Sequence, residues 1–362
     1  MASSFFPICT VVLLASGVVF LLLPSTRRWG QQFGRTDRTV SRLGGVAVAL
    51  SVLFSTGVGL SLEGVGAVDW VGWCWYIVGG CGVLALGILD DLRGLTALQK
   101  LWPQLAIALV LWAGGVRIET LSMPWGASWV LSSAVSMSVT VIWIVGVTNA
   151  MNLVDGMDGL AGSIGWIAAL AFGIIAALVG RMDVLMMTTA LLGALTVFLR
   201  FNWRPASIHL GDGGSLFLGF SLAILGVQTL EGPVRDSSVL MPLWILVVPL
   251  ADMTFAVVRR VWTNRSPLER DRGHIHHRLV RSGWTPVQTV WVLSIITLVG
   301  GIAAVALQLG IDVLWVLVSS TTVLFGILSV LRGVHRRDGN GTAGHLSTTA
   351  TGSRFWTKAG RS

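Results

Sequence analysis

Charged residues are scarce in this sequence of 362 residues, since Asp, Glu, Lys and Arg together make up 12% of it. A soluble globular domain carries about 25% charge, so this chain lacks the polar surface of that class. Hydrophobic residues make up 54%, and they gather in runs long enough to cross a bilayer. The composition indicates a polytopic membrane protein, whose Lys and Arg report membrane orientation rather than nucleic-acid binding.

Cysteine is also scarce. Only Cys9, Cys74 and Cys81 occur, and all three lie inside apolar runs. The sequence has no CxxC motif and no paired framework, so it predicts neither a disulfide scaffold nor a zinc site. The apolar setting indicates that the three cysteines are packing residues within the membrane.

Eleven apolar runs approach the length of about 20 residues that crosses a bilayer. The first run follows no basic residues and precedes Arg27 and Arg28, which is typical of a retained helix with its N-terminus outside rather than a cleaved signal peptide. The sequence predicts an all-α polytopic protein with a single membrane domain over 1–331 and a disordered basic tail over 332–362. The predicted spans are 5–23, 43–62, 70–89, 101–115, 129–148, 162–180, 184–200, 213–230, 239–258, 288–308 and 312–331.

The basic residues predict the orientation of these spans. All but three of the 25 Lys and Arg fall in segments that eleven spans place on one side of the membrane, the exceptions being Arg117, Arg181 and Arg235. Because Lys and Arg are enriched in cytoplasmic loops, the crowded side and the C-terminus are predicted to be cytoplasmic.

Four polar segments fall on that predicted cytoplasmic side. The central one, 149–160, places Asn149, Asn152, Asp155 and Asp158 at every third position. An ordinary polar loop between two spans is the alternative explanation. It accounts poorly for two amides beside the membrane boundary, because such groups cost about 2 kcal/mol or more unless they have partners.

A second segment ends the third predicted span with Asp90 and Asp91, and Lys100 follows it. Adjacent carboxylates can hold a cation, accept a proton or attack phosphorus. Two Asp that merely end a helix are the alternative, but carboxylates oppose the dipole at a helix C-terminus.

The third and fourth segments supply a further carboxylate and a group of cationic donors. Asp212 lies between glycines at the start of the eighth predicted span, where a helix N-terminus can receive a phosphate. His274, His276 and His277 fall within four residues. A basic interfacial helix attracted to anionic lipid is the alternative for this last segment, and it explains the neighbouring Arg better than the His. Carboxylates suited to Mg²⁺ together with cationic donors are what phosphoryl transfer requires.

These segments together resemble the polyprenyl-phosphate N-acetylhexosamine-1-phosphate transferases. The resemblance covers residues 87 to 279 in the family's order, and the form of the histidine segment is similar to the branch that transfers GlcNAc-1-phosphate. The matching stretches read GILDDLRGL at 87–95, NAMNLVDGMDGLAGS at 149–163, FNWRPASIHLGDGGSLFLG at 201–219 and SPLERDRGHIHHRL at 266–279.

The resemblance implies that HexNAc-1-phosphate, GlcNAc-1-phosphate in this branch, passes from a UDP-sugar to undecaprenyl phosphate with release of UMP. It implies Mg²⁺, with Mn²⁺ as an alternative, held by Asp212 with help from Asn152. It places the protein in the bacterial plasma membrane, with its site on the cytoplasmic face, and it is compatible with a homodimer. The other implied roles are catalysis by Asp90, Asp91, Asp155 and Asp158, and substrate binding by Lys100, Asn149, Asp155, Asp158, His274, His276, His277 and Arg278.

The sequence departs from the family pattern in the segment 35–45, which lacks the prolines that usually precede Gly44 and Gly45. The resemblance leaves open which amino sugar is transferred and which envelope glycan, such as lipopolysaccharide or teichoic acid, receives the product. It also leaves open whether an Asp of the 90/91 pair acts as a base for direct attack or forms a covalent intermediate.

Three other functions fit the sequence less well. The phospho-MurNAc-pentapeptide transferases belong to the same superfamily but carry a different histidine segment. A transporter places ionisable residues near the bilayer midplane, whereas the chief charge inside a predicted span here is Asp252, toward its inner end. A CDP-alcohol phosphatidyltransferase needs an Arg that the stretch after Asp158 lacks.

Overall fold

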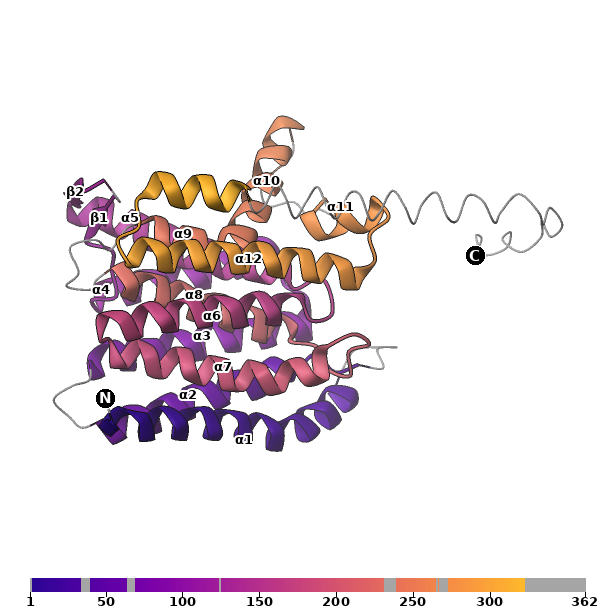
Figure 1. The fold of residues 1–362 in the computed structure, drawn as a ribbon. Helices are drawn as coiled ribbons and strands as arrows, with labels where there is room; N and C mark the ends of the chain where they lie inside the picture. The colour runs from indigo at the N-terminus through magenta and orange to yellow at the C-terminus, as the bar shows by residue number, and fades with distance from the viewer. Residues whose placement is uncertain are drawn as a thin grey trace. The chain divides into compact units, whose positions relative to one another are not determined.

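In the computed structural model, long apolar helices run side by side (Figure 1). Eight helices of the described part are long and apolar enough to cross a membrane. The structure describes residues 2–33, 40–63, 69–123, 125–230, 239–264, 266 and 273–322. The eight helices are α1 (Ala2–Phe33), α2 (Gly44–Glu63), α3 (Trp70–Arg93), α5 (Ser133–Val154), α6 (Leu160–Val179), α7 (Met182–Asn202), α8 (Gly211–Leu230) and α12 (Pro286–Gln308).

The prediction of a helical multi-pass membrane protein is confirmed, while the count of eleven spans and the orientation stay predictions. The predicted span 101–115 overlaps a helix over Ala97–Ala113 whose 17 residues are fewer than those of the eight long helices, and the predicted span 239–258 is broken at Leu246. A two-stranded antiparallel hairpin, absent from the prediction, precedes α5. The shorter elements are α4 (Ala97–Ala113), β1 (Thr120–Ser122), β2 (Ser128–Val130), α9 (Leu240–Ile245), α10 (Val247–Trp262), α11 (Ile275–Arg281) and an apolar helix over Val313–Thr322.

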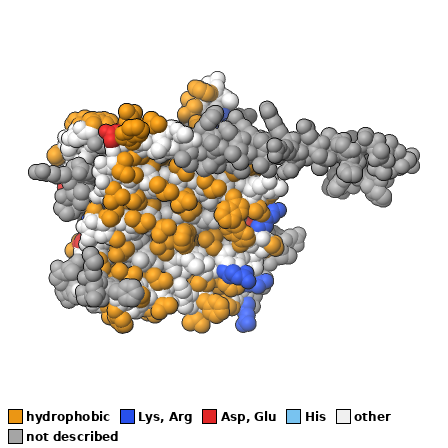
Figure 2. Space-filling view, viewed as in Figure 1, with side chains coloured by type: hydrophobic (Ala, Val, Ile, Leu, Met, Phe, Trp, Pro, Cys, Tyr) orange, Lys and Arg blue, Asp and Glu red, His pale blue; other side chains and the backbone are white. Residues whose placement is uncertain are grey.

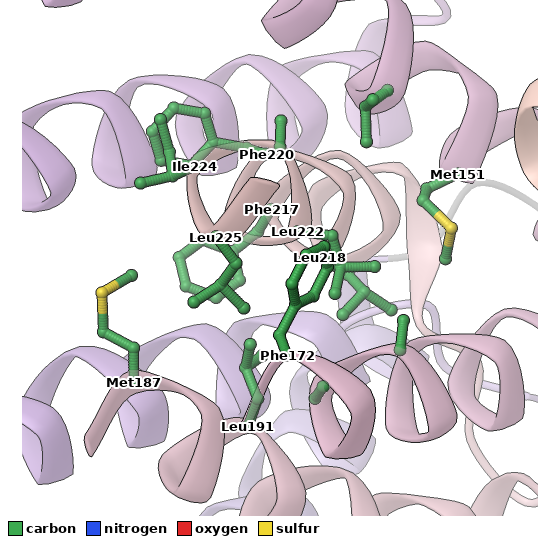
Figure 3. Close-up of a cluster of buried hydrophobic side chains, with 14 of the residues drawn as sticks. Met151, Phe172, Met187, Leu191, Phe217, Leu218, Phe220, Leu222, Ile224 and Leu225 are labelled. Carbon is green, nitrogen blue, oxygen red and sulfur yellow. The ribbon is translucent and has the colours of Figure 1, made fainter. Parts of the chain in front are cut away.

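Helix α8 forms the centre of the described bundle, and its residues from Gly213 to Val227 are all buried and all apolar or small. Its side chains Phe217, Phe220 and Leu225 project into a core that also receives Phe172 from α6 and Leu191 from α7 (Figure 3). A helix that is hydrophobic all round is expected in such a fully enclosed position. This burial fixes the N-terminal end of α8, where Asp212 lies.

Two glycine contacts let α8 approach its neighbours closely. A Cβ added to Gly45 would lie 2.0 Å from the Cα of Gly214, and one added to Gly87 would lie 2.4 Å from the Cα of Gly213. Any side chain at these positions would separate α8 from α2 and α3. The glycines therefore bring the C-terminal end of α3, with its Asp pair, against the first turn of α8.

The surface of the bundle is hydrophobic over the face seen in Figure 2, and Lys and Arg gather toward the end where α1 finishes and α11 lies. Large apolar side chains are exposed on several helices of the bundle, among them Leu13, Phe20 and Ile142. Such extensive apolar surface suits lipid rather than water.

The predicted division into a membrane domain and a tail stays a prediction. The residues up to Ser320 belong to one compact unit, whereas the predicted tail, 332–362, lies outside the described residues. The first part of the atypical 35–45 segment, residues 35–39, lies outside them too.

Candidate active site

The two neighbouring aspartates that end α3 face different partners. Asp90 is buried, its Oδ2 lies 2.7 Å from Lys100 Nζ, and its Oδ1 accepts a hydrogen bond of 2.7 Å from the Leu95 backbone N–H. Gly94 takes the left-handed conformation, with φ +68°, and its N–H caps the Asp90 carbonyl. This turn brings α4 back along α3, so that Lys100 neutralises Asp90.

Asp91 points instead toward α8. Its Oδ2 accepts a hydrogen bond of 3.1 Å from the Gly213 backbone N–H, and its Oδ1 lies 3.8 Å from Arg42 Nη1. Within the described residues, no hydrogen-bond donor reaches that Oδ1. Gly211 lies so close that an added Cβ would be 2.8 Å from Asp91 Oδ2. Asp91 is thus a buried carboxylate with spare acceptor capacity at the start of α8.

Asp212 is held from the opposite side by α5. Asn152 Nδ2 donates to Asp212 Oδ1 and to Ser215 Oγ, both at 2.8 Å. Asn152 lies within α5, which continues to Val154, beyond the end of the predicted span 129–148. Helix α8 therefore supplies both acceptors that this part-buried amide requires.

Asp155 completes a carboxylate cluster, defined here as Asp91, Asp155 and Asp212. It caps the C-terminal end of α5, outside the membrane-spanning segments. Burial, followed by the charges of Asp212 and Asp91, raises the pKa of the Asp155 carboxyl to about 7. Three carboxylates that repel one another need a cation or a proton to share the site.

The donor chemistry of this carboxylate cluster fits a hard divalent cation. Carboxylate and amide oxygens are the ligands that Mg²⁺ takes in proteins, usually alongside water and substrate phosphate. The carboxylate of Asp212 is such a ligand, and the charges of Asp91 and Asp155 lie close enough to act on it and on each other. In the described part of the chain, however, no three acidic, His or Cys side chains already converge as a finished metal site. A cation there would rely on water or phosphate for further ligands.

Asp158 belongs to a neighbouring wall, formed with the segment after α7. Its Oδ1 lies 3.7 Å from His209 Nδ1, and its Oδ2 accepts from the Ala206 N–H at 3.3 Å. Asn202 ties the two loops together, because its Oδ1 accepts from Gly159 N–H while its Nδ2 donates to the Ile208 carbonyl. Sequence reasoning did not single out His209, although it stands inside the motif that contains Asp212.

Asn149 does not join the carboxylate cluster through any contact in the described structure. Its Nδ2 donates to Gln104 Oε1 at 2.5 Å and to the Val145 carbonyl at 2.8 Å. Gln104 is buried on α4, one turn after Lys100. The contacts therefore give Asn149 a part in joining α5 to α4, and its predicted contact with substrate stays a prediction.

The histidine segment forms the short helix α11. His276 is buried with its Nε2 toward Gly156, where an added Cβ would lie 2.4 Å away. Burial, followed by the charge of His277, lowers the pKa of His276 to about 4, so this ring is neutral at physiological pH. The side chain of Arg278 is exposed.

A cavity of about 620 Å³ opens between α11 and the loops that follow α5 and α7. A volume of this size suits a ligand as large as a sugar nucleotide. Acidic, basic and apolar side chains face it together. It is lined by Gly156, Met157, Asp158, Arg204, Pro205, His277, Val280, Arg281 and Pro286.

Comparison with known proteins agrees with this arrangement. The sequence model of glycosyl transferase family 4 matches residues 73–230, which contain the whole carboxylate cluster. The probable undecaprenyl-phosphate N-acetylglucosaminyl 1-phosphate transferase of Bacillus subtilis (strain 168) is 34% identical over 273 residues, which cover 75% of this chain and 74% of that protein. The chain belongs to glycosyl transferase family 4.

Other members of family 4 show the same likeness. The decaprenyl-phosphate N-acetylglucosaminephosphotransferase of Mycobacterium tuberculosis (strain ATCC 25618 / H37Rv) is 34% identical over 278 residues, with 70% of this chain and 68% of that protein covered. The undecaprenyl-phosphate alpha-N-acetylglucosaminyl 1-phosphate transferase of Escherichia coli (strain K12) is 27% identical over 220 residues, which cover 59% of this chain and 60% of that protein. The predicted resemblance to the GlcNAc-1-phosphate branch is confirmed.

Proposed function

We propose that this family 4 protein transfers GlcNAc-1-phosphate from UDP-GlcNAc to undecaprenyl phosphate and releases UMP. The observation that carries the proposal is the carboxylate cluster, which lies beside the Lys100–Asp90 pair and is formed by the ends of α3, α5 and α8. The names of the relatives support both the GlcNAc-1-phosphate group and a polyprenyl phosphate acceptor. The UDP donor, the cytoplasmic face of the plasma membrane and a place at the first membrane step of an envelope glycan follow from the family resemblance and the distribution of basic residues.

Mg²⁺ suits the carboxylate cluster, and Asp212, oriented by Asn152, would hold it alongside water and substrate phosphate. The bound cation would offset negative charge on the pyrophosphate of the donor. Lys100, which lies near the N-terminal end of α4 and faces Asp90, is placed to bind a phosphate oxygen. The cavity beside α11 would hold the sugar and nucleotide, with His277 and Asp158 on its walls.

The contacts of the two adjacent aspartates separate their roles. Asp90 Oδ2 lies 2.7 Å from Lys100 Nζ, whereas Asp91 Oδ1 lies 3.8 Å from its cationic neighbour Arg42 Nη1 and is less strongly held by it. Asp91 is therefore the better base for the acceptor. It removes the proton from the lipid phosphate, whose oxygen forms a bond to the β-phosphorus as the bond from that phosphorus to the bridging oxygen breaks and UMP leaves.

The test is UMP release by purified protein in lipid nanodiscs with undecaprenyl phosphate and a panel of UDP-sugars. Release is expected with UDP-GlcNAc, and removal of divalent cations by EDTA should stop it until Mg²⁺ is restored. UDP-MurNAc-pentapeptide in the panel tests the other branch, and a sugar-phosphate adduct on Asp91 formed without lipid would favour the covalent route. Absence of UMP with every sugar would refute the proposed function.

A further inference from the structure

Helix α10 holds the start of α11 through a buried carboxylate that the proposed reaction has not used. Asp252 is 3% exposed, its Oδ2 lies 3.1 Å from His274 Nδ1, and its Oδ1 accepts a hydrogen bond of 2.7 Å from the Ile275 N–H. Arg259, two turns further along α10, donates from Nη1 to the Gly273 carbonyl at 2.9 Å. Three consecutive residues at the start of α11 are thus fixed to α10.

The contact with Asp252 also sets the tautomer of His274. A carboxylate only accepts hydrogen bonds, so the proton between these groups belongs to His274 Nδ1. The neutral ring then presents Nε2 as an acceptor, in the manner of histidines whose second nitrogen is fixed by a carboxylate. Because His274 is itself buried, its ring has little freedom to turn away.

Contacts between neighbouring histidine rings connect His274 to the cavity. Its ring is parallel to that of His276, with centroids 5.8 Å apart and an interplanar angle of 5°. His276 lies 4.2 Å from His277 by ring centroids and faces Gly156. Both His277 and Gly156 line the 620 Å³ cavity. A shift of the His274 ring would therefore displace His276 and His277, and His277 lines the cavity.

We propose that Asp252 is a positioning residue for the transfer reaction: it fixes the tautomer and orientation of His274 and, through the stacked rings, the α11 wall of the substrate cavity. This inference rests on the proposed function. If Asp252 were only a cap for a surface helix, its loss would lower stability without changing how the protein handles the sugar nucleotide.

The main test compares Asp252→Asn with wild type in nanodiscs. The amide of Asn can keep the bond from Ile275 while its NH₂ donates to His274 Nδ1, which forces the proton to Nε2. We expect kcat/KM for the UDP-sugar to fall roughly 10- to 100-fold, as when other carboxylate partners of functional histidines are lost. Asp252→Glu, which restores an accepting carboxylate, should recover part of that loss.

The matched control is Asp183→Asn. Asp183 is likewise a carboxylate with a close side-chain partner, Arg181, at 2.7 Å, but it lies in the first turn of α7 and does not line the cavity. We expect its turnover to stay close to that of wild type. Wild-type kcat and KM in Asp252→Asn would overturn the proposal. So would equal losses of activity and thermal midpoint in Asp252→Asn and Asp183→Asn, since they would indicate a structural role alone.

A readout independent of turnover separates this inference from the proposed function. In protein labelled with ¹⁵N-histidine, the His274 signal is identified by its loss in His274→Gln. Wild type should show the proton on Nδ1 at pH 8, and Asp252→Asn should show it on Nε2. An unchanged tautomer would contradict the inference even in an active enzyme, whereas a switched tautomer in a protein that releases no UMP would leave the contact standing and refute only the function.

Discussion

The two walls of the candidate site are built in opposite ways. The carboxylate cluster comes from the ends of three membrane helices, which glycine contacts bring together around α8. The histidine wall is a helix of seven residues, held by Asp252 and Arg259. The first wall gathers negative charge that only a cation or proton relieves, whereas the second supplies neutral or cationic donors. A rigid wall for phosphate chemistry and a separately held wall for the sugar nucleotide would let substrate choice vary without disturbing the reaction centre.

The comparison predicts that the largest loss follows a change in the carboxylate cluster. Asp91→Asn keeps the size of the side chain but removes its charge and its ability to take a proton. We expect kcat to fall about 10³-fold with little change in the KM for the UDP-sugar, the effect of losing a general base. UMP release measures it, with Asp183→Asn as the control. A tenfold rise in KM at normal kcat would instead place Asp91 in substrate binding.

The second prediction concerns Lys100, the cation that pairs with the buried Asp90. Lys100→Gln leaves Asp90 buried without its cation, so both kcat and the thermal midpoint should fall, kcat by about 10²-fold. Arg117→Gln is the control, since Arg117 pairs with Glu119 at the same distance of 2.7 Å but in a more exposed position just before β1. Because exposed ion pairs contribute little, that variant should match wild type. Equal shifts in the two thermal midpoints would show that the burial of Asp90 does not matter.

The histidine wall should respond differently. In Gly156→Ala, the added methyl group would lie only 2.4 Å from His276 Nε2. The His276 ring, and α11 with it, must therefore move. We expect KM for the UDP-sugar to rise roughly tenfold, or about 1.4 kcal/mol, with kcat less affected. Gly17→Ala in α1 is the control, because nothing lies within 4 Å of its added Cβ. A lower kcat at unchanged KM would assign Gly156 to the reaction centre instead.

The same contrast explains what sequence alone could predict. The long apolar runs and the acidic motifs lie in continuous stretches, so the helical membrane fold and the identity of the site segments were readable. The division of labour between Asp90 and Asp91 was not, because it depends on the direction in which α4 and α8 approach the end of α3. The pairing of Asp252 with His274 joins residues 22 positions apart, one on α10 and one just before α11, and Asn149 contacts Gln104 on another helix. Such contacts follow from packing and leave no periodic signal in the chain.

The smallest expected effect is a pH dependence of stability in the carboxylate cluster. The pKa of Asp155 is about 7 in the folded protein, against 3.8 as its ordinary value, and burial is the first cause. A raised carboxyl pKa favours the protonated folded state, so this contribution to stability is present below pH 4 and is lost as the pH rises through 7. In EDTA, the thermal midpoint of wild type should therefore fall between pH 5 and 8 by more than that of Asp155→Asn, which has no charge to gain. Mg²⁺ should reduce the difference between the two proteins most at pH 8, because a bound cation stabilises the ionised cluster that EDTA leaves unbalanced. Parallel pH curves for the two proteins in EDTA would contradict this, and would show that Asp155 is already balanced without a cation.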